Sequence, residues 1–179
     1  ENIEKYINGE NMTNNLWYNR FGGNETISSY DFLEKKENIF KKMREHLSFL
    51  KKQDYYYYFN KPVGKINKKI FISHGFALPY FKKRLKVKND KLTQKQFTCN
   101  RLNNLYFNLN NENNISELES YNVLNIFGHV ANQEVLRTNI LMDLDTSCVY
   151  GNKLTCYDVS NDKYISTKCI DKIKYNWFD

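Results

Sequence analysis

The sequence predicts a single α/β (or α+β) domain over residues 1–179, with a mixed β-sheet core flanked by helices. Its 179 residues and 21.5 kDa suffice for one domain with a substantial core, but not for two full domains. Hydrophobic residues make up 41% and aromatic residues 16% of the chain, which excludes global disorder. Two short apolar runs, residues 69–73 and 123–127, are typical of buried strands.

The first fifty residues indicate helical structure. Residues 3–12 are expected to complete a helix. Residues 16–23 form an aromatic segment that ends in Gly22–Gly23. We expect a tight turn there, with a backbone angle φ that glycine adopts more readily than other residues. Residues 32–52 carry apolar side chains at helical spacing among Lys and Glu, which predicts an amphipathic surface helix with His46 solvated or half-buried on it.

The middle of the chain alternates between apolar and basic segments. The aromatic run 55–59 predicts a strand packed on both faces, which is a commoner use of such residues than a base-stacking platform. The run 69–73 predicts a buried strand, and residues 80–95 a lysine-rich connection. Residues 97–101 are β-prone, and the Asn-rich stretch 103–120 has the composition of an exposed loop.

The last third of the chain reads as a series of strands. Residues 123–127 predict a second buried strand. Further strands are expected over 140–145, 148–159 and 163–167, with turns at 146–147 and 160–162. The basic and aromatic tail, residues 172–179, is expected to lie over the core.

The charge of the chain favours no partner by itself. Lys and Arg number 27 against 20 Asp and Glu, which gives a formal net charge of +7 and a pI near 9.1. Nucleic acid is the less favoured partner, because most of the basic residues are lysines and the richness in Asn, Ile and Tyr is typical of an AT-rich genome. No stretch approaches the ~20 consecutive apolar residues that a membrane span needs, and the mean hydropathy is −0.73, so no membrane partner is expected.

The cysteines indicate a reduced, cytoplasmic setting. Cys99, Cys148, Cys156 and Cys169 form no C-x-x-C pair, so neither a zinc ribbon nor a thioredoxin-like motif is indicated. The chain opens Glu-Asn-Ile-Glu-Lys, without an initiator Met and without a secretory signal. We therefore expect a processed or truncated piece of an intracellular protein.

Two of the three histidines follow apolar runs directly and adjoin a glycine. His74 ends Phe-Ile-Ser-His before Gly75, and His129 follows Ile-Phe-Gly. Ligands bind at the carboxyl ends of strands in open α/β sheets, where a neighbouring glycine permits a sharp turn. The pair suggests a shared metal site, whereas either histidine taken singly is more often a structural residue.

Arg101 is the third candidate site residue. It follows residues 97–100 and lies between the two histidines in sequence, where a guanidinium could bind a phosphate with two hydrogen bonds. A surface salt bridge is the alternative for Arg101 read alone.

Five blocks of the sequence occur in the order of a known family. Residues 123–129 (VLNIFGH) and 144–158 (LDTSCVYGNKLTCYD) resemble the strand-GHT and IDTGCVYGGKLTAL signature of the calcineurin-like metallophosphoesterases. Residues 72–75 (ISHG) are similar to that family's FVHAG segment, and 100–101 (NR) to its WNR. Residues 17–30 resemble its W-x-x-NGG-x-x-TL-x-SY stretch. The resemblance is strongest to the PPP-type serine/threonine phosphatases of bacteria and phages and to their diadenosine-tetraphosphatase relatives.

The resemblance implies a fold, two metals and a reaction. The fold would be a four-layer αββα sandwich, His74 and His129 would each be a metal ligand, and Arg101 would clamp the phosphoryl oxygens in catalysis. Two divalent ions about 3.5 to 4 Å apart would share a water that attacks phosphorus in line. Mn²⁺ is expected, with Fe, Zn or Ni as alternatives, and a phosphorylated protein or a small phosphoester or nucleotide would be the substrate.

Three upstream motifs of that family, GDxHG, GDxxDRG and GNHE, are not in the printed sequence. They supply the remaining ligands, a second arginine and the leaving-group acid, so the resemblance implies the C-terminal part of a phosphatase domain, with Glu1 at or just after GNHE and the upstream half as a partner. Val130 and Ser147 stand where the family has Thr and Gly. The alternatives are a catalytically incomplete binding or regulatory module, and a dinucleoside-tetraphosphate or polynucleotide phosphatase.

Overall fold

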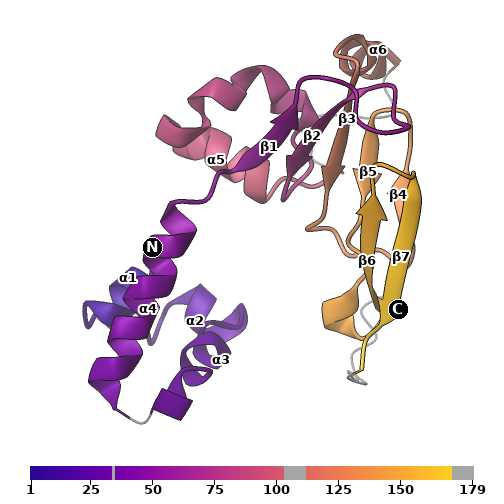
Figure 1. The fold of residues 1–179 in the computed structure, drawn as a ribbon. Helices are drawn as coiled ribbons and strands as arrows, with labels where there is room; N and C mark the ends of the chain where they lie inside the picture. The colour runs from indigo at the N-terminus through magenta and orange to yellow at the C-terminus, as the bar shows by residue number, and fades with distance from the viewer. Residues whose placement is uncertain (34, 103–111, 171–179) are drawn as a thin grey trace. The chain divides into compact units, whose positions relative to one another are not determined.

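A computed structural model describes residues 1–33, 35–102 and 112–170. The chain divides into two compact units, Glu1–Gln53 and Asp54–Asp179, where the sequence predicted one domain (Figure 1). We call them unit 1 and unit 2 and describe each by itself. That unit 1 and unit 2 belong to a single domain stays a prediction.

Unit 1 is helical, as the sequence predicted. Its elements are α1 (Asn2–Ile7), α2 (Leu16–Arg20), α3 (Gly23–Ser28), the 3-10 turn η1 (Asp31–Leu33) and α4 (Lys36–Lys51). Its core is small and centres on the buried side chains of Ile7, Ile27 and Met43. The amphipathic helix expected over 32–52 is confirmed by α4, and His46 is exposed on it, with its Nδ1 2.6 Å from the hydroxyl oxygen of Tyr30.

The turn expected at Gly22–Gly23 is confirmed. Gly22 has a φ of 74°, in the left-handed region that glycine adopts without strain. A Cβ atom on Gly23 would lie 2.7 Å from the Trp17 ring, so only glycine lets α3 begin this close to α2. Glycine is thus favoured at position 22 by the backbone angle and at position 23 by the close approach of Trp17.

Unit 2 is built on a mixed five-stranded sheet flanked by helices (Figure 1). The strand order is β1-β2-β3-β5-β4. The strands are β1 (Tyr56–Phe59), β2 (Lys69–Ser73), β3 (Val123–Phe127), β4 (Leu136–Arg137) and β5 (Leu141–Asp143). Strands β2, β3 and β5 are parallel neighbours, while β1 and β4 pair antiparallel at the two edges. Both strands predicted from apolar runs are confirmed, and β3 is buried along its whole length.

Hydrophobic clusters cover the two faces of this sheet differently. One face packs against the 3-10 segment η2 (Leu78–Asn89), α5 (Lys91–Thr98) and α6 (Glu112–Ser120). On the other face, Ile70, Leu124 and Met142 pack against Ile66 and Tyr157. Tyr157 belongs to β6 (Lys153–Asp158), which forms a two-stranded antiparallel sheet with β7 (Lys163–Lys168).

Several predictions about the middle of the chain were wrong. Strand β1 is not packed on both faces, because Tyr57 is 60% exposed and only alternate residues point inward at this sheet edge. The lysine-rich connection over 80–95 folds instead into η2 and most of α5. The β-prone segment 97–101 forms no strand, because its first two residues end α5 and the other three follow that helix.

The predictions for the later segments were partly right. Residues 112–120 of the expected loop form α6, while residues 103–111 lie outside the described part. The strands expected over 140–145 and 163–167 are confirmed by β5 and β7, but 148–159 contains the 3-10 turn η3 (Cys148–Tyr150) before β6. The tail 172–179 also lies outside the described residues. No helix in the described part is long and apolar enough to cross a bilayer.

Candidate functional site

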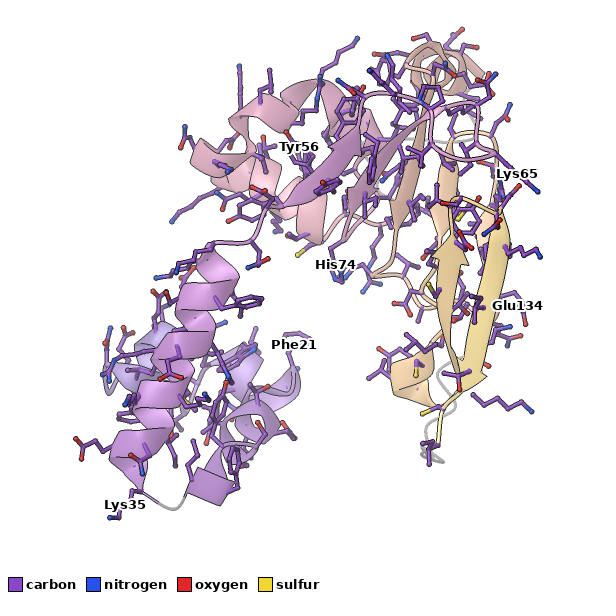
Figure 2. The ribbon with its side chains drawn as sticks, viewed as in Figure 1. Phe21, Lys35, Tyr56, Lys65, His74 and Glu134 are labelled. Carbon is purple, nitrogen blue, oxygen red and sulfur yellow. The ribbon has the colours of Figure 1, made fainter. Side chains whose placement is uncertain are left out.

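The two predicted histidines come together at one edge of the sheet. His74 directly follows β2, and His129 follows β3 after Gly128, so both lie beyond the carboxyl ends of adjacent parallel strands. Their ring centroids are 5.1 Å apart with an interplanar angle of 59°. Figure 2 labels His74 at this edge. The amide of Gly128 donates to the carbonyl of His74 over 2.9 Å, which joins the two turns directly.

A fully buried asparagine fixes the turn that carries His74. The Asn125 amide nitrogen donates to the Phe71 carbonyl (2.9 Å) and the Ser73 hydroxyl (3.0 Å). Its carbonyl oxygen accepts hydrogen bonds from the amides of Ala77 (2.9 Å) and Leu78 (3.0 Å). Because an unpaired buried amide costs about 1–3 kcal/mol, this side chain stabilises the segment on both sides of His74.

The chain before Arg101 is tied to the same turn. The backbone carbonyl of Asn100 accepts a hydrogen bond from the Phe76 amide (3.1 Å). The side-chain amide of Asn100 donates a second hydrogen bond to the Phe76 carbonyl (2.7 Å). A Cβ atom on Gly75 would lie 2.8 Å from the Asn100 backbone, so this approach requires glycine. The backbone of Arg101 is therefore positioned beside the turn of His74, while its side chain is exposed.

The charges around His129 favour its neutral form. Partial burial lowers the pKa of His129 below its usual value, and the nearby His74 and Arg101 lower this pKa further. A hydrogen bond with the Cys99 backbone and the negative charge of Asp145 act in the opposite direction. The structure thus places Arg101 close enough to His129 to act on it, and a neutral imidazole is the form that binds metals.

His129 adopts an unusual backbone conformation. Its φ is 72°, in the left-handed region that costs a residue with a Cβ about 1–2 kcal/mol. Such strain gathers at functional sites when the surroundings hold the residue there. The hydrogen bond from the Gly128 amide to the His74 carbonyl fixes the residue before His129.

A small cavity adjoins the two histidines. Its volume is about 280 Å³, just below the roughly 300–1,000 Å³ typical of small-molecule sites, so it has room for a small group. It is lined by His74, Phe127, Gly128, His129, Leu144, Asp145, Thr146, Cys148, Lys153 and Leu154. Asp145 and Lys153 therefore join the site, although the sequence analysis did not single them out as site residues.

A signal for Asp145 was present in the sequence. Asp145 lies two residues past the end of β5, which is parallel to β3, so it reaches the same sheet edge as the two histidines. The prediction of one strand over 140–145 placed Asp145 within the strand and hid that position. No comparable pattern in the sequence marks Lys153, because the turn before β6 is what brings this residue to the cavity.

Buried polar groups hold the wall that Asp145 belongs to. Asp143 is fully buried, accepts hydrogen bonds from the Asp145 amide (3.1 Å) and the Asn132 side chain (2.9 Å), and its pKa is raised to about 7 by burial. Ser147 has a φ of 61°, and its hydroxyl donates to the Asn132 carbonyl (2.6 Å). The left-handed conformation explains why glycine would also suit position 147.

The histidine pair fits a shared metal ion, but only as part of its ligand set. With metal–nitrogen bonds of about 2 Å, two imidazoles on one ion have ring centres about 5 Å apart, close to the 5.1 Å found here. Within residues 1–33, 35–102 and 112–170, no group of three or more His, Cys, Asp or Glu side chains is arranged to hold a metal. A two-metal centre would need ligands beyond these residues.

A larger hollow of about 720 Å³ lies in unit 1, between α1 and α4. Its lining is mostly that of a charged helix surface, with Glu4, Arg44 and Lys51 among its residues. No histidine lines it, so it offers no comparable chemistry.

Comparison with known proteins adds no family to this geometry. No protein-family model matches the chain, and no curated protein matches it significantly.

Proposed function

We propose that this chain carries part of the active site of a metal-dependent phosphoester hydrolase, with a serine/threonine phosphoprotein phosphatase as the leading candidate. The observation that carries the proposal is the meeting of His74 and His129 at the carboxyl ends of adjacent parallel strands, with Arg101 acting on His129. The motif resemblance names the same three residues independently of the geometry. As part of the proposal, the five-stranded sheet and its helices form one half of a four-layer αββα sandwich in a cytoplasmic protein.

Each residue has a distinct role in this proposal. His74 and His129 hold a divalent ion through their neutral rings, and Mn²⁺ is the expected metal. The ion, when bound, activates water and neutralises phosphate charge. Arg101 binds two phosphoryl oxygens through its planar guanidinium, because its side chain is exposed beside the histidines and free to reach a substrate.

The cavity bears on the substrate. At about 280 Å³ it admits a phosphoryl group and leaves the rest of the substrate outside. Lys153 lines it as a second cation, although it also pairs with Glu134 at 2.6 Å. A phosphorylated side chain of a protein can present a single phosphoryl group in this way, and so can the end of a nucleotide or polynucleotide.

One observation favours a second candidate, a phosphatase-like binding or regulatory module. Among the described residues no cluster of three or more metal-binding side chains exists. A chain with the histidine pair alone would bind a metal or a phosphate weakly without hydrolysing a phosphoester. Metal binding and turnover must therefore be measured separately.

Metal binding is the first test of the proposal. Mn²⁺ titration of the purified chain, followed by the electron paramagnetic resonance signal of the free ion, should show binding that His74→Ala and His129→Ala weaken about 10- to 100-fold. His46→Ala is the matched control, because His46 is exposed in unit 1 and bonds to Tyr30. Equal affinity in all four proteins would contradict the proposal.

Hydrolysis distinguishes the two candidates. In the protein with the upstream segment restored, Mn²⁺ and an aryl phosphate should give turnover that falls at least about 100-fold in His74→Ala and His129→Ala and stays unchanged in His46→Ala. Arg101→Ala should raise KM and weaken inhibition by inorganic phosphate. Metal binding without any hydrolysis, also after the upstream segment is restored, would favour the binding module.

A further inference from the structure

Two cysteines meet at the rim of the cavity. Cys148 lies in η3 and lines the cavity, while Cys169 directly follows β7. The Cys169 amide donates to the Asn152 carbonyl (2.8 Å), and the Asn152 amide donates to the Ser147 carbonyl (3.1 Å). These bonds continue the β6–β7 ladder beyond the Lys153–Lys168 pair and bring the end of β7 to the start of η3.

The backbone bonds bring Cys169 next to the turn that contains Cys148. The two side chains are close enough to interact, because Cys169 raises the pKa of the Cys148 thiol. Both residues are half-buried, so small molecules in solvent can reach them. Both are free thiols in this structure.

We propose that Cys148 and Cys169 are a redox-modification site, at which a small disulfide such as oxidised glutathione converts the two thiols into an intramolecular disulfide. The inference rests on the thiol pair alone and not on the proposed function. In a reducing compartment such a pair stays reduced and is oxidised reversibly when the glutathione pool shifts.

The reaction balances with one molecule of oxidised glutathione. One cysteine thiolate attacks a glutathione sulfur, forms a mixed disulfide and releases the first glutathione. The second thiolate attacks the protein sulfur of that mixed disulfide, forms the Cys148–Cys169 bond and releases the second glutathione. Two S–H bonds become one S–S bond, and the two electrons and two protons end on two reduced glutathione molecules.

The bond would fasten the cavity wall to the end of β7. The residues on either side of η3, Ser147 and Gly151, both have left-handed backbones. Burial raises the pKa of Cys148, and the neighbouring Cys169 raises it further. The thiolate form of Cys148 is therefore scarce at neutral pH, and oxidation should accelerate about tenfold per pH unit up to that pKa.

The test is oxidation of the full chain followed by a peptide map. The native protein is treated with oxidised glutathione at pH 8, free thiols are alkylated, and trypsin is added. We expect residues 138–153 and 169–172 joined by a disulfide, with a rise in Tm of about 5 to 10 °C for the oxidised protein. A linkage that involves Cys99 or Cys156, or no intramolecular bond at all, would overturn the inference.

Single variants separate a built pair from general thiol reactivity. In Cys169→Ser the reaction should stop at a mixed disulfide on Cys148, and in Cys148→Ser at one on Cys169. Cys99→Ser and Cys156→Ser are the matched controls, because both residues are exposed free thiols, and each should form the native bond at the wild-type rate. Equal slowing in all four variants would contradict a specific pair.

Discussion

Units 1 and 2 differ in what they bury. In the described part of the chain, eight polar residues are buried and all of them lie in unit 2: Ser73, Thr93, Asn100, Asn125, Asp143, Thr146, Ser147 and Thr155. The buried residues of unit 1 are apolar apart from Gly23. Buried polar groups stabilise a structure only when fully paired.

The difference indicates which unit is built to position side chains. In unit 2, Asn125 fixes the turn of His74, Asn100 fixes the backbone before Arg101, and Asp143 fixes the wall near Asp145. Unit 1 has no such device among its described residues, because its helices are held by apolar contacts around Met43 and by surface pairs. Specific hydrogen bonds define a geometry more narrowly than hydrophobic contact does.

Removing the central polar group of unit 2 is expected to have the largest effect on stability. Asn125→Ala would remove the acceptor of the buried Ala77 and Leu78 amides and one donor to the Phe71 carbonyl. We expect a loss of about 3 to 6 kcal/mol in the free energy of unfolding, measured by urea denaturation. The control Asn67→Ala, at an exposed position, should change it by less than about 0.5 kcal/mol. A loss below 1 kcal/mol for Asn125→Ala would break the comparison.

Two buried methionines provide a matched pair for the apolar cores. Met142 of unit 2 and Met43 of unit 1 are both essentially inaccessible to solvent. Met142→Ala should cost about 3 to 5 kcal/mol and Met43→Ala about 2 to 3, because the small cluster around Met43 can collapse or admit water more easily. Hydrogen exchange of the amides of each unit reports the two losses separately. A larger loss at Met43 would reverse the comparison.

The buried carboxyl group gives unit 2 a pH dependence of its own. Burial raises the pKa of Asp143 to about 7, above its value near 4 in an unfolded chain. The folded state therefore retains a proton that the unfolded state loses, so this contribution is fully present below about pH 4 and is lost as pH rises through 7. Between pH 5 and pH 7 the loss is about 2 kcal/mol.

The Asp143→Asn variant isolates this contribution. Its free energy of unfolding, measured by urea denaturation at each pH, should lack the decline of about 2 kcal/mol that Asp143 produces in the wild type. Asp162→Asn is the opposite control, since the Arg137 hydrogen bond lowers the pKa of Asp162 and its stabilisation is lost only as pH falls below about 4. An unchanged pH profile in Asp143→Asn would show that this group is not buried as described.

The smallest expected effect concerns the left-handed residue Ser147. Ser147→Gly removes about 1 kcal/mol of backbone strain and also the hydroxyl bond to Asn132, so the net change should be under about 1 kcal/mol. Ser147→Ala keeps the strain and loses the bond, and should destabilise by about 1 to 2 kcal/mol. Thermal unfolding of the two variants checks the order, and a more stable Ala variant would contradict it.

The sequence predicted the parts of unit 2 in which local pattern and environment agree. Strand β3 follows an apolar run because both of its faces are covered along its whole length. Strand β2 follows the same pattern except at Ile72, which is exposed. The rule that ligands gather at carboxyl ends of strands predicted that His74 and His129 share one sheet edge, and the structure brings them together there. Arg101 was predicted from its position between them in the sequence, and the structure places its charge near His129. Their role in a functional site stays a prediction.

The features that the sequence did not predict lack the apolar spacing of an ordinary amphipathic helix or strand. Segment η2 buries Leu78, Phe81 and Val87, which follow the three-residue repeat of a 3-10 helix. Helix α5 buries Thr93 and Phe97, so half of its buried face is polar. In β1 every residue is aromatic, and nothing in the composition tells the inward side chains from the outward ones.

The parallel sheet also determines when the site can form during synthesis. A ribosome adds about 5–20 residues per second, and about 70 residues separate β2 from β5, so β2 emerges roughly 4 to 14 s before the last strand parallel to it. During that interval its apolar side chains, including Ile70 and Phe71, have at most part of their final cover and are available to chaperones or to other nascent chains. His74 is thus the first residue of the candidate site to leave the ribosome, and the cavity beside it closes only after the turn at Cys148 has followed.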